Sequence, residues 1–163
     1  MITFRIHNDN DFQFLREMLF EAIFWNKKKD KPSLEEGLSY DYSKHILHEF
    51  GSRLGDHAVI AEIDGTRVGA AFIRYWDNDI NTRGYLSENI PVLVIGVHKN
   101  YRRLGVGSGL MDAMKSEATI NGISEISLCV TKSNIAYQLY INNEFEIVEE
   151  VNSSYNMLWK DKN

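Results

Sequence analysis

The chain has 163 residues, and its 44% hydrophobic and 12% aromatic content suffices to bury the core of a globular domain and excludes a disordered chain. Its formal net charge of −5 argues against general binding to DNA or RNA, which requires a basic face. We therefore expect one domain over residues 1–163, with small-molecule or protein partners and no nucleic acid.

The N-terminal part of the chain predicts a strand and two helices. Thr3–His7 alternates like a strand, and Asp9 or Asn10 is a candidate cap for the helix after it. The apolar residues of that helix recur at helical spacing and are Phe12, Leu15, Leu19 and Ile23. A second helix is predicted over Tyr42–Phe50, with Gly51 as its left-handed cap.

The middle of the chain predicts three strands. Asp64-Gly65 is a strong hairpin signal and joins the strand Ala58–Ile63 to the strand Val68–Trp76. The aliphatic run Pro91–Val97 predicts a third strand, which leads directly into a glycine-rich stretch.

The sequence beyond the glycines predicts a helix, a buried strand, a further helix and a pair of strands. The first helix has a buried face and ends near Asn121-Gly122. That face consists of Val106, Leu110, Met111, Met114 and Ala118. The later elements are the strand Ile126–Val130, a helix that Ser133 and Asn134 can cap and that runs to about Ile141, and strands over Glu146–Val151 and Tyr155–Lys160. This order of elements makes a layered α/β sheet.

Cysteine usage and hydropathy indicate the compartment. Cys129 is the only cysteine, so no internal disulfide can form, and within its apolar run we expect a buried thiol. The N-terminus lacks the apolar core of a signal peptide, and no apolar run is long enough to span a membrane. The sequence therefore predicts a cytoplasmic protein without a membrane partner.

Three glycines stand in Tyr101–Met111, between the aliphatic strand and the next helix. A strand that enters such a turn points several backbone N–H groups at one spot, beside the positive end of the helix dipole. Gly105 and Gly107 lack the Cβ atoms that would block close approach, and Arg102 and Arg103 can add charge at the rim. The turn predicts a phosphate site, with an ordinary tight turn and solvated arginines as the alternative.

The spacing excludes two common phosphate motifs. A P-loop requires a lysine after its last glycine, and none is present here. The dinucleotide fingerprint G-x-G-x-x-G also fails, because its third glycine position is Leu110.

What remains is R-x-x-G-x-G over Arg102–Gly107, together with N-x-A-x-x-L-Y over Asn134–Tyr140. With these two motifs the chain resembles the GNAT superfamily of acyl-CoA-dependent N-acetyltransferases. The resemblance implies a layered α/β fold whose central sheet is mixed, mostly antiparallel and twisted, with about seven strands and about four flanking helices. It leaves a monomer and a homodimer equally open.

The resemblance also implies how acetyl-CoA, as acyl donor, is held. Pantetheine would pair with the backbone of the strand at Ile95 and Val97, and Asn134 would contact the cofactor arm, unless it is only a helix cap. The pyrophosphate would lie on the amides of the glycine turn. These residues, with the preceding arginine, are Arg102, Arg103, Leu104, Gly105, Val106, Gly107 and Ser108.

The implied reaction is acetyl transfer to a primary amine of a small molecule or peptide, by direct attack in a ternary complex. A backbone N–H at Val97 or its neighbour would stabilise the thioester oxygen. Tyr140 would protonate the leaving thiolate, and the alternative role for this residue is packing as an aromatic side chain. No metal is expected, because His45 and His48 share a helix face without a third ligand.

The chain departs from the family pattern at the position of the general base. Relatives often have P-E-L in the strand, where this chain has Pro91-Val92-Leu93, and Val92 cannot accept a proton. Glu88 is the nearest acid and is the candidate base through a water, with a solvated surface carboxylate as the alternative. A second departure is Glu144 in place of the usual glycine, and we expect Asn143 to take the turn instead.

The acceptor and the functional class stay open. A basic run of lysines at 27, 28, 29 and 31 would favour an acidic acceptor if it faces the pocket, whereas Asp77, Asp79 and Glu88 would favour a polycation. The missing strand glutamate motivates a second hypothesis, a non-catalytic module of the same fold that binds acyl-CoA as a sensor.

Overall fold

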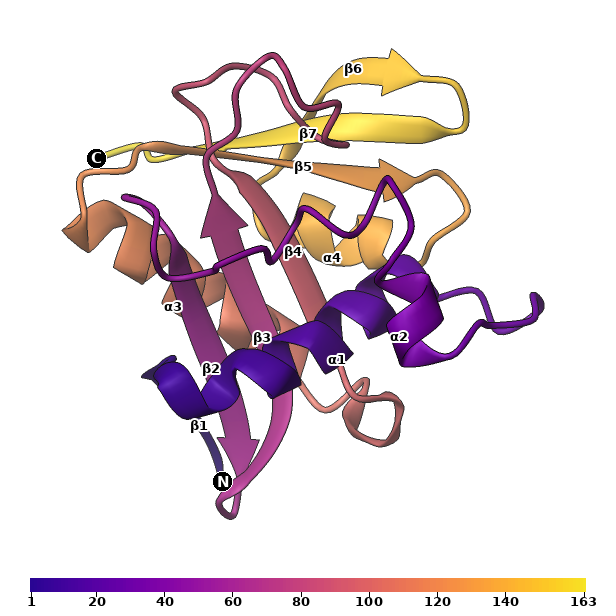
Figure 1. Ribbon diagram of the computed structural model, residues 1–163. Helices are drawn as coiled ribbons and strands as arrows, with labels where there is room; N and C mark the ends of the chain where they lie inside the picture. The colour runs from indigo at the N-terminus through magenta and orange to yellow at the C-terminus, as the bar shows by residue number, and fades with distance from the viewer.

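Seven strands form one sheet in the order β1-β2-β3-β4-β5-β7-β6, with helices on both faces, in a computed structural model that describes residues 1–163 (Figure 1). Neighbouring strands are antiparallel except β4 and β5, which are parallel. The strands are β1 Ile2–Ile6, β2 His57–Ile63, β3 Thr66–Arg74, β4 Val92–Val97, β5 Glu125–Thr131, β6 Glu146–Val151 and β7 Ser154–Lys160. The α-helices are α1 Phe12–Ile23, α2 Leu34–Gly37, α3 Val106–Ile120 and α4 Ala136–Asn142. None of them combines the length and the apolar character that a membrane crossing requires.

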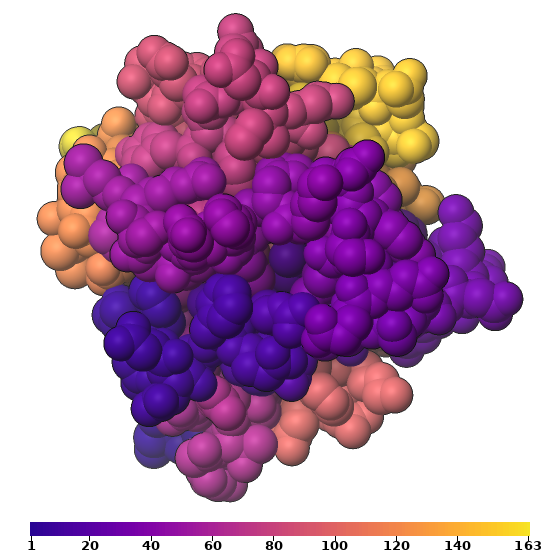
Figure 2. Space-filling model, in the orientation of Figure 1, coloured from indigo at the N-terminus to yellow at the C-terminus, as the bar shows by residue number.

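The sheet separates two hydrophobic cores. On one face α1 lies across β3 and β4 and buries Phe14, Leu15, Met18 and Leu19 in a core that also includes residues of β2. On the other face α3 and α4 cover the larger core, which includes Leu110 and Met114 of α3. In Figure 2 the indigo α1 and the purple segment that follows it cover the front of the sheet.

The start of α1 differs from the sequence prediction. Asn8, and not Asp9 or Asn10, is the cap: its side chain accepts the N–H of Asn10, and its own N–H donates to Asp11. A 3₁₀ turn follows this cap, so the helix begins later, and Phe12 is 42% exposed instead of buried.

The Asp64-Gly65 hairpin is confirmed. Both residues have positive φ, 49° and 80°, as a turn that matches the strand twist requires. The resulting pair β2–β3 forms the centre of the sheet next to β4.

The helix predicted over Tyr42–Phe50 is wrong. The segment consists of single turns closed by bonds such as Ile46 N–H to the Ser43 carbonyl and His48 N–H to the His45 carbonyl. Buried Arg74 explains the difference, because its Nη1 donates to the carbonyl oxygens of Ile46 and His48 and so competes for helical acceptors. The short α2, capped by the Ser33 hydroxyl, was missed.

The elements after the glycine turn match their prediction within a few residues, with one correction. Gly122 ends α3 with φ of 74°. At the end of α4 it is Glu144, with φ of 68°, that takes the left-handed turn, and not Asn143, whose φ is −102°. The Asn143 side chain instead donates to the Leu139 carbonyl and closes the helix.

Candidate active site

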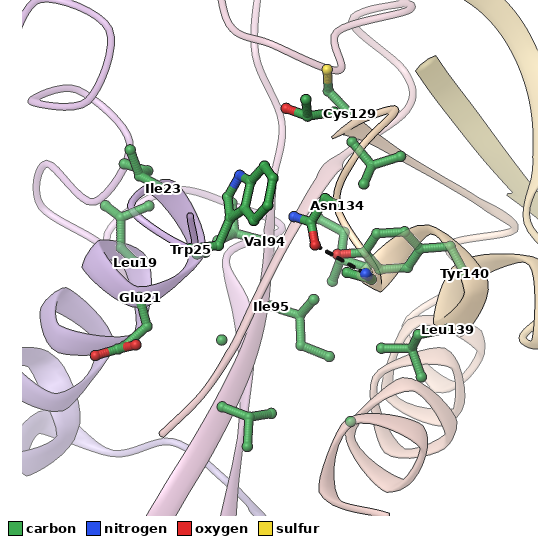
Figure 3. Close-up of a pocket in the computed structure, with 18 of the residues that line it drawn as sticks. Leu19, Glu21, Ile23, Trp25, Val94, Ile95, Cys129, Asn134, Leu139 and Tyr140 are labelled. Carbon is green, nitrogen blue, oxygen red and sulfur yellow. Dashed lines mark hydrogen bonds between the residues drawn. The ribbon is translucent and has the colours of Figure 1, made fainter. Parts of the chain in front are cut away.

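A gap in the sheet creates the main cavity. The parallel strands β4 and β5 pair only at Val92 and Ser127 and then diverge, leaving a cavity of about 830 Å³. Its walls come from the end of α1, from β3, β4 and β5, from the glycine turn and from α4 (Figure 3).

One edge of β4 lines this gap with unpaired backbone. The Ser127 N–H donates to the Pro91 carbonyl on one side of the strand, and the His98 N–H donates to the Val68 carbonyl on the other. Backbone groups alternate between the two neighbouring strands, and the β3–β4 register is unbroken. The N–H and C=O of Ile95 and the N–H of Val97 therefore face the gap unpaired, as pairing with an extended ligand requires, whereas the Val97 carbonyl accepts from Arg102.

The glycine turn opens into the same cavity. Arg103 and Gly105 both take left-handed φ, 63° and 87°, and α3 begins at Val106 without a side-chain cap. Its first N–H groups have no partner within the helix. A Cβ atom at Gly107 would lie 3.1 Å from the Leu139 side chain of α4, so the turn packs closely against that helix.

The two arginines of the turn play different parts. Arg102 donates through Nη2 to Glu21 of α1 at 2.9 Å and through Nε to the Val97 carbonyl at 3.0 Å. It thus ties α1 to β4 and has little freedom left for a ligand. Arg103 and the nearby Lys99 line the cavity and make no ion pair, so they supply its free positive charge at this end.

Asn134 and Tyr140 lie on the far wall, facing Trp25 across the gap (Figure 3). The Asn134 side-chain oxygen accepts the Ala136 N–H at 2.9 Å, so this residue is a helix cap whose amide nitrogen is still free. Tyr140 is 8% exposed and its hydroxyl has no partner within the protein. Burial, and secondarily the Cys129 thiol, raise the pKa of Tyr140 well above its ordinary value.

Glu88 and Cys129 lie elsewhere in the structure than their predicted roles require. Glu88 is exposed and does not contribute to the cavity wall. Cys129 is half-buried and lines the cavity instead of being a fully buried core thiol. The one carboxylate in the wall is Glu21, which Arg102 already pairs.

His45, in the sequence only one of two histidines without a third metal ligand, is linked to the cavity by a contact that the sequence does not reveal. Its Nε2 lies 3.2 Å from the hydroxyl of Thr82, which lines the cavity, and its Nδ1 lies 3.2 Å from the Asp41 carbonyl. Burial lowers the pKa of His45 below its usual 6.5. A contact between residues 37 positions apart leaves no signal in a single sequence.

Comparisons with known proteins agree with this geometry. The family model of the acetyltransferase (GNAT) family matches residues 16–141. The PaiA N-acetyltransferase from Thermoplasma acidophilum, solved in complex with coenzyme A, superposes with a TM-score of 0.74 at 21% identity, over 98% of this chain and 99% of that chain. An acetyltransferase of the GNAT family from Streptococcus pneumoniae gives 0.67 at 20% identity, over 99% of each chain. YncA from Salmonella typhimurium, solved with its cofactor acetyl-CoA, gives 0.66 at 16% identity, over 99% of this chain and 95% of that chain.

The chain belongs to the acetyltransferase (GNAT) family, since the family model covers most of its length. The resemblance based on Arg102–Gly107 and Asn134–Tyr140 is thereby confirmed. The layered α/β fold is also confirmed, with its mixed sheet of seven strands and four α-helices.

Proposed function

We propose that this protein transfers the acetyl group of acetyl-CoA to a primary amine of a small molecule or peptide, by direct attack within a ternary complex. The observation that supports this best is the unpaired backbone of Ile95 and the unpaired N–H of Val97, which lead into the open amides of the glycine turn within one cavity.

The glycine turn and β4 together suit the donor. The backbone N–H groups from Arg103 to Ser108 would bind the pyrophosphate beside the positive end of α3, with Lys99 and Arg103 adding charge. The N–H and C=O of Ile95 and the N–H of Val97 would pair with the pantetheine amides, and a strand N–H would then stabilise the charge that develops on the thioester oxygen.

Proton removal from the acceptor needs a base. A lysine-like amine has a pKa near 10.4, so at pH 7 only about one molecule in two thousand is neutral, a penalty of about 4 to 5 kcal/mol. We assign this task to His45 acting through Thr82, because Glu88 lies outside the cavity wall. With its Nδ1–H donated to Asp41, the neutral imidazole keeps Nε2 free to accept the Thr82 hydroxyl proton, and that hydroxyl can accept from the amine.

Tyr140 serves the leaving group. Its raised pKa keeps the hydroxyl protonated throughout the working pH range, and no protein acceptor competes for its proton. A hydrogen bond from this hydroxyl to the thiolate sulfur stabilises the charge as the carbon–sulfur bond breaks.

A non-catalytic acyl-CoA sensor is the competing function, and the absence of an unpaired carboxylate from the cavity wall favours it. Thiol release from acetyl-CoA across a panel of amines, with calorimetric binding of CoA measured in parallel, separates the two. Turnover on an amine supports the enzyme, whereas tight CoA binding without release on any small amine or peptide supports the sensor.

A further inference from the structure

The acceptor end of the cavity carries positive charge that the donor site does not use. We propose that the acceptor amine also bears a carboxylate or phosphate group, and that Arg83 binds this group at the end of the cavity opposite the glycine turn. The inference rests on the proposed acetyl transfer and names the substrate class of the same site.

Contacts with β5 and β7 fix the position of Arg83. Its Nη2 donates to the Ser154 hydroxyl at 2.9 Å and to the Cys129 sulfur at 3.3 Å. In Figure 3 Cys129 lies at the top of the cavity and Leu139, which packs on Gly107, lies at the bottom, with Tyr140 between them. Arg83 is therefore remote from the donor's phosphates.

The guanidinium of Arg83 has unused binding capacity. It makes no ion pair, and its Nε and Nη1 donate to no protein acceptor, although the residue lines the cavity. Because Nη2 already donates to Ser154 and Cys129, the N–H groups of Nε and Nη1 are the ones left to give charge-assisted hydrogen bonds to an oxygen of a carboxylate or phosphate.

The charged residues of the cavity wall favour an acceptor that carries an anionic group. Lys27 and Lys28 also line the cavity without an ion pair, whereas Asp77 and Asp79 do not reach its wall. Glu21 is neutralised by Arg102. The free charges of the cavity wall are therefore positive, and a polycationic acceptor would face like charge in it.

Matched pairs of amines test the proposal. We would compare each of the common L-amino acids with its carboxamide, and phosphoethanolamine with ethanolamine, and include spermidine as a polycation. The acidic member of at least one pair should give a kcat/KM at least about tenfold higher than its neutral partner, as a charge-assisted hydrogen bond implies. The two kinds of pair distinguish a carboxylate from a phosphate.

Arg83→Gln should remove this preference while leaving the calorimetric Kd for CoA unchanged, and Lys162→Gln, a remote surface change, should alter neither. The proposal is overturned if neutral amines or spermidine are preferred by the natural chain, or if Arg83→Gln keeps the ratio. It is also overturned if Arg83→Gln weakens CoA itself, because the charge would then belong to the donor site.

Direct binding keeps the test independent of catalysis. If no amine is acetylated, the proposed function fails, and the same pairs are titrated calorimetrically into the CoA complex. A preference for the acidic members that Arg83→Gln abolishes would still support the subsite, and equal or absent binding of both members would overturn it.

Discussion

Tyr140 is a buried residue whose hydroxyl has no hydrogen-bond partner in the protein. In the proposed reaction the departing sulfur becomes that partner. Tyr140→Phe keeps the ring that packs against Phe145 and removes only the donor. We expect turnover to fall by about 10- to 1000-fold with little change in the Kd for acetyl-CoA. Stopped-flow or steady-state thiol release measures the first, and calorimetry the second.

Tyr137→Phe is the matched control, because Tyr137 lies on the same helix, packs against Tyr155 and does not line the cavity. Equal turnover in Tyr140→Phe and Tyr137→Phe would rule out the proton-donor role.

The role of His45 makes a prediction about pH. Burial lowers its pKa below 6.5; the bond to the Asp41 carbonyl opposes this shift, and the positive charges of Arg53, Lys44 and Arg74 add to it. The imidazole is therefore neutral and able to accept a proton at pH 7. Activity should fall as the pH drops through that lowered pKa. His45→Gln should reduce kcat/KM by about 10²- to 10⁴-fold near neutrality and recover at high pH, where the amine itself is neutral.

His48→Gln is the control, since His48 is exposed and lies outside the cavity wall. The readout is the pH profile of kcat/KM for both variants on one amine. A profile for His45→Gln that runs parallel to that of the natural chain would remove the His45–Thr82 pair from proton transfer.

Close packing of α1 on β4 sets the width of the cavity. A Cβ atom at Gly96 would lie 2.3 Å from the Met18 carbonyl oxygen, and a helix backbone cannot move aside as a flexible side chain can. Gly96→Ala should therefore displace α1 and lower the free energy of unfolding by about 1 to 3 kcal/mol.

Gly109→Ala gives the contrast, because the added methyl group would meet the ring of Phe4, a partly exposed side chain that can rotate. Thermal unfolding of both variants measures the difference. A Tm for Gly96→Ala as high as that for Gly109→Ala would show that α1 does not depend on this contact.

The elements that sequence reasoning predicted correctly are those set by local chemistry. Asp64-Gly65 supplies the two positive φ angles that the hairpin needs, and the glycine turn and the face of α3 follow from glycine placement and helical spacing. The error over Tyr42–Phe50 arose from a long-range contact, because Arg74 of β3 takes carbonyl oxygens that a helix would use. His45, through Thr82, and Arg83 likewise connect to the cavity only through tertiary placement, whereas the proposed donor site lies within motifs contiguous in sequence.

At the scale of the whole molecule, the buried pair of Arg74 and Asp56 joins β3 to the segment that precedes β2. Arg74 donates through Nε and Nη2 to both Asp56 oxygens at 2.9 Å. Burial alone would raise the pKa of Asp56, but the bonds from Arg74 and from the Gly51 N–H outweigh it and lower the pKa below 3.8. This carboxylate therefore stabilises the fold above its unfolded pKa, and that contribution is lost as pH falls through the lower folded value.

Asp56→Asn should leave Arg74 unpaired in the interior and cost about 3 to 5 kcal/mol at pH 7. Urea unfolding between pH 7 and pH 3 should show the gap to the natural chain narrowing below pH 3.8. Asp64→Asn, at an exposed hairpin position that tolerates asparagine, should be neutral. A gap that does not change with pH would contradict the assigned ionisation of Asp56.

Calorimetric titration of CoA into three proteins tests most directly whether the gap between β4 and β5 is the donor site. These are the natural chain, Gly107→Ala and Gly107→Glu. An added alanine Cβ meets only the Leu139 side chain, so we expect near-normal affinity, whereas glutamate brings bulk and negative charge to the amides proposed to bind the pyrophosphate and should abolish binding. Unchanged CoA affinity in a folded Gly107→Glu protein would contradict the account.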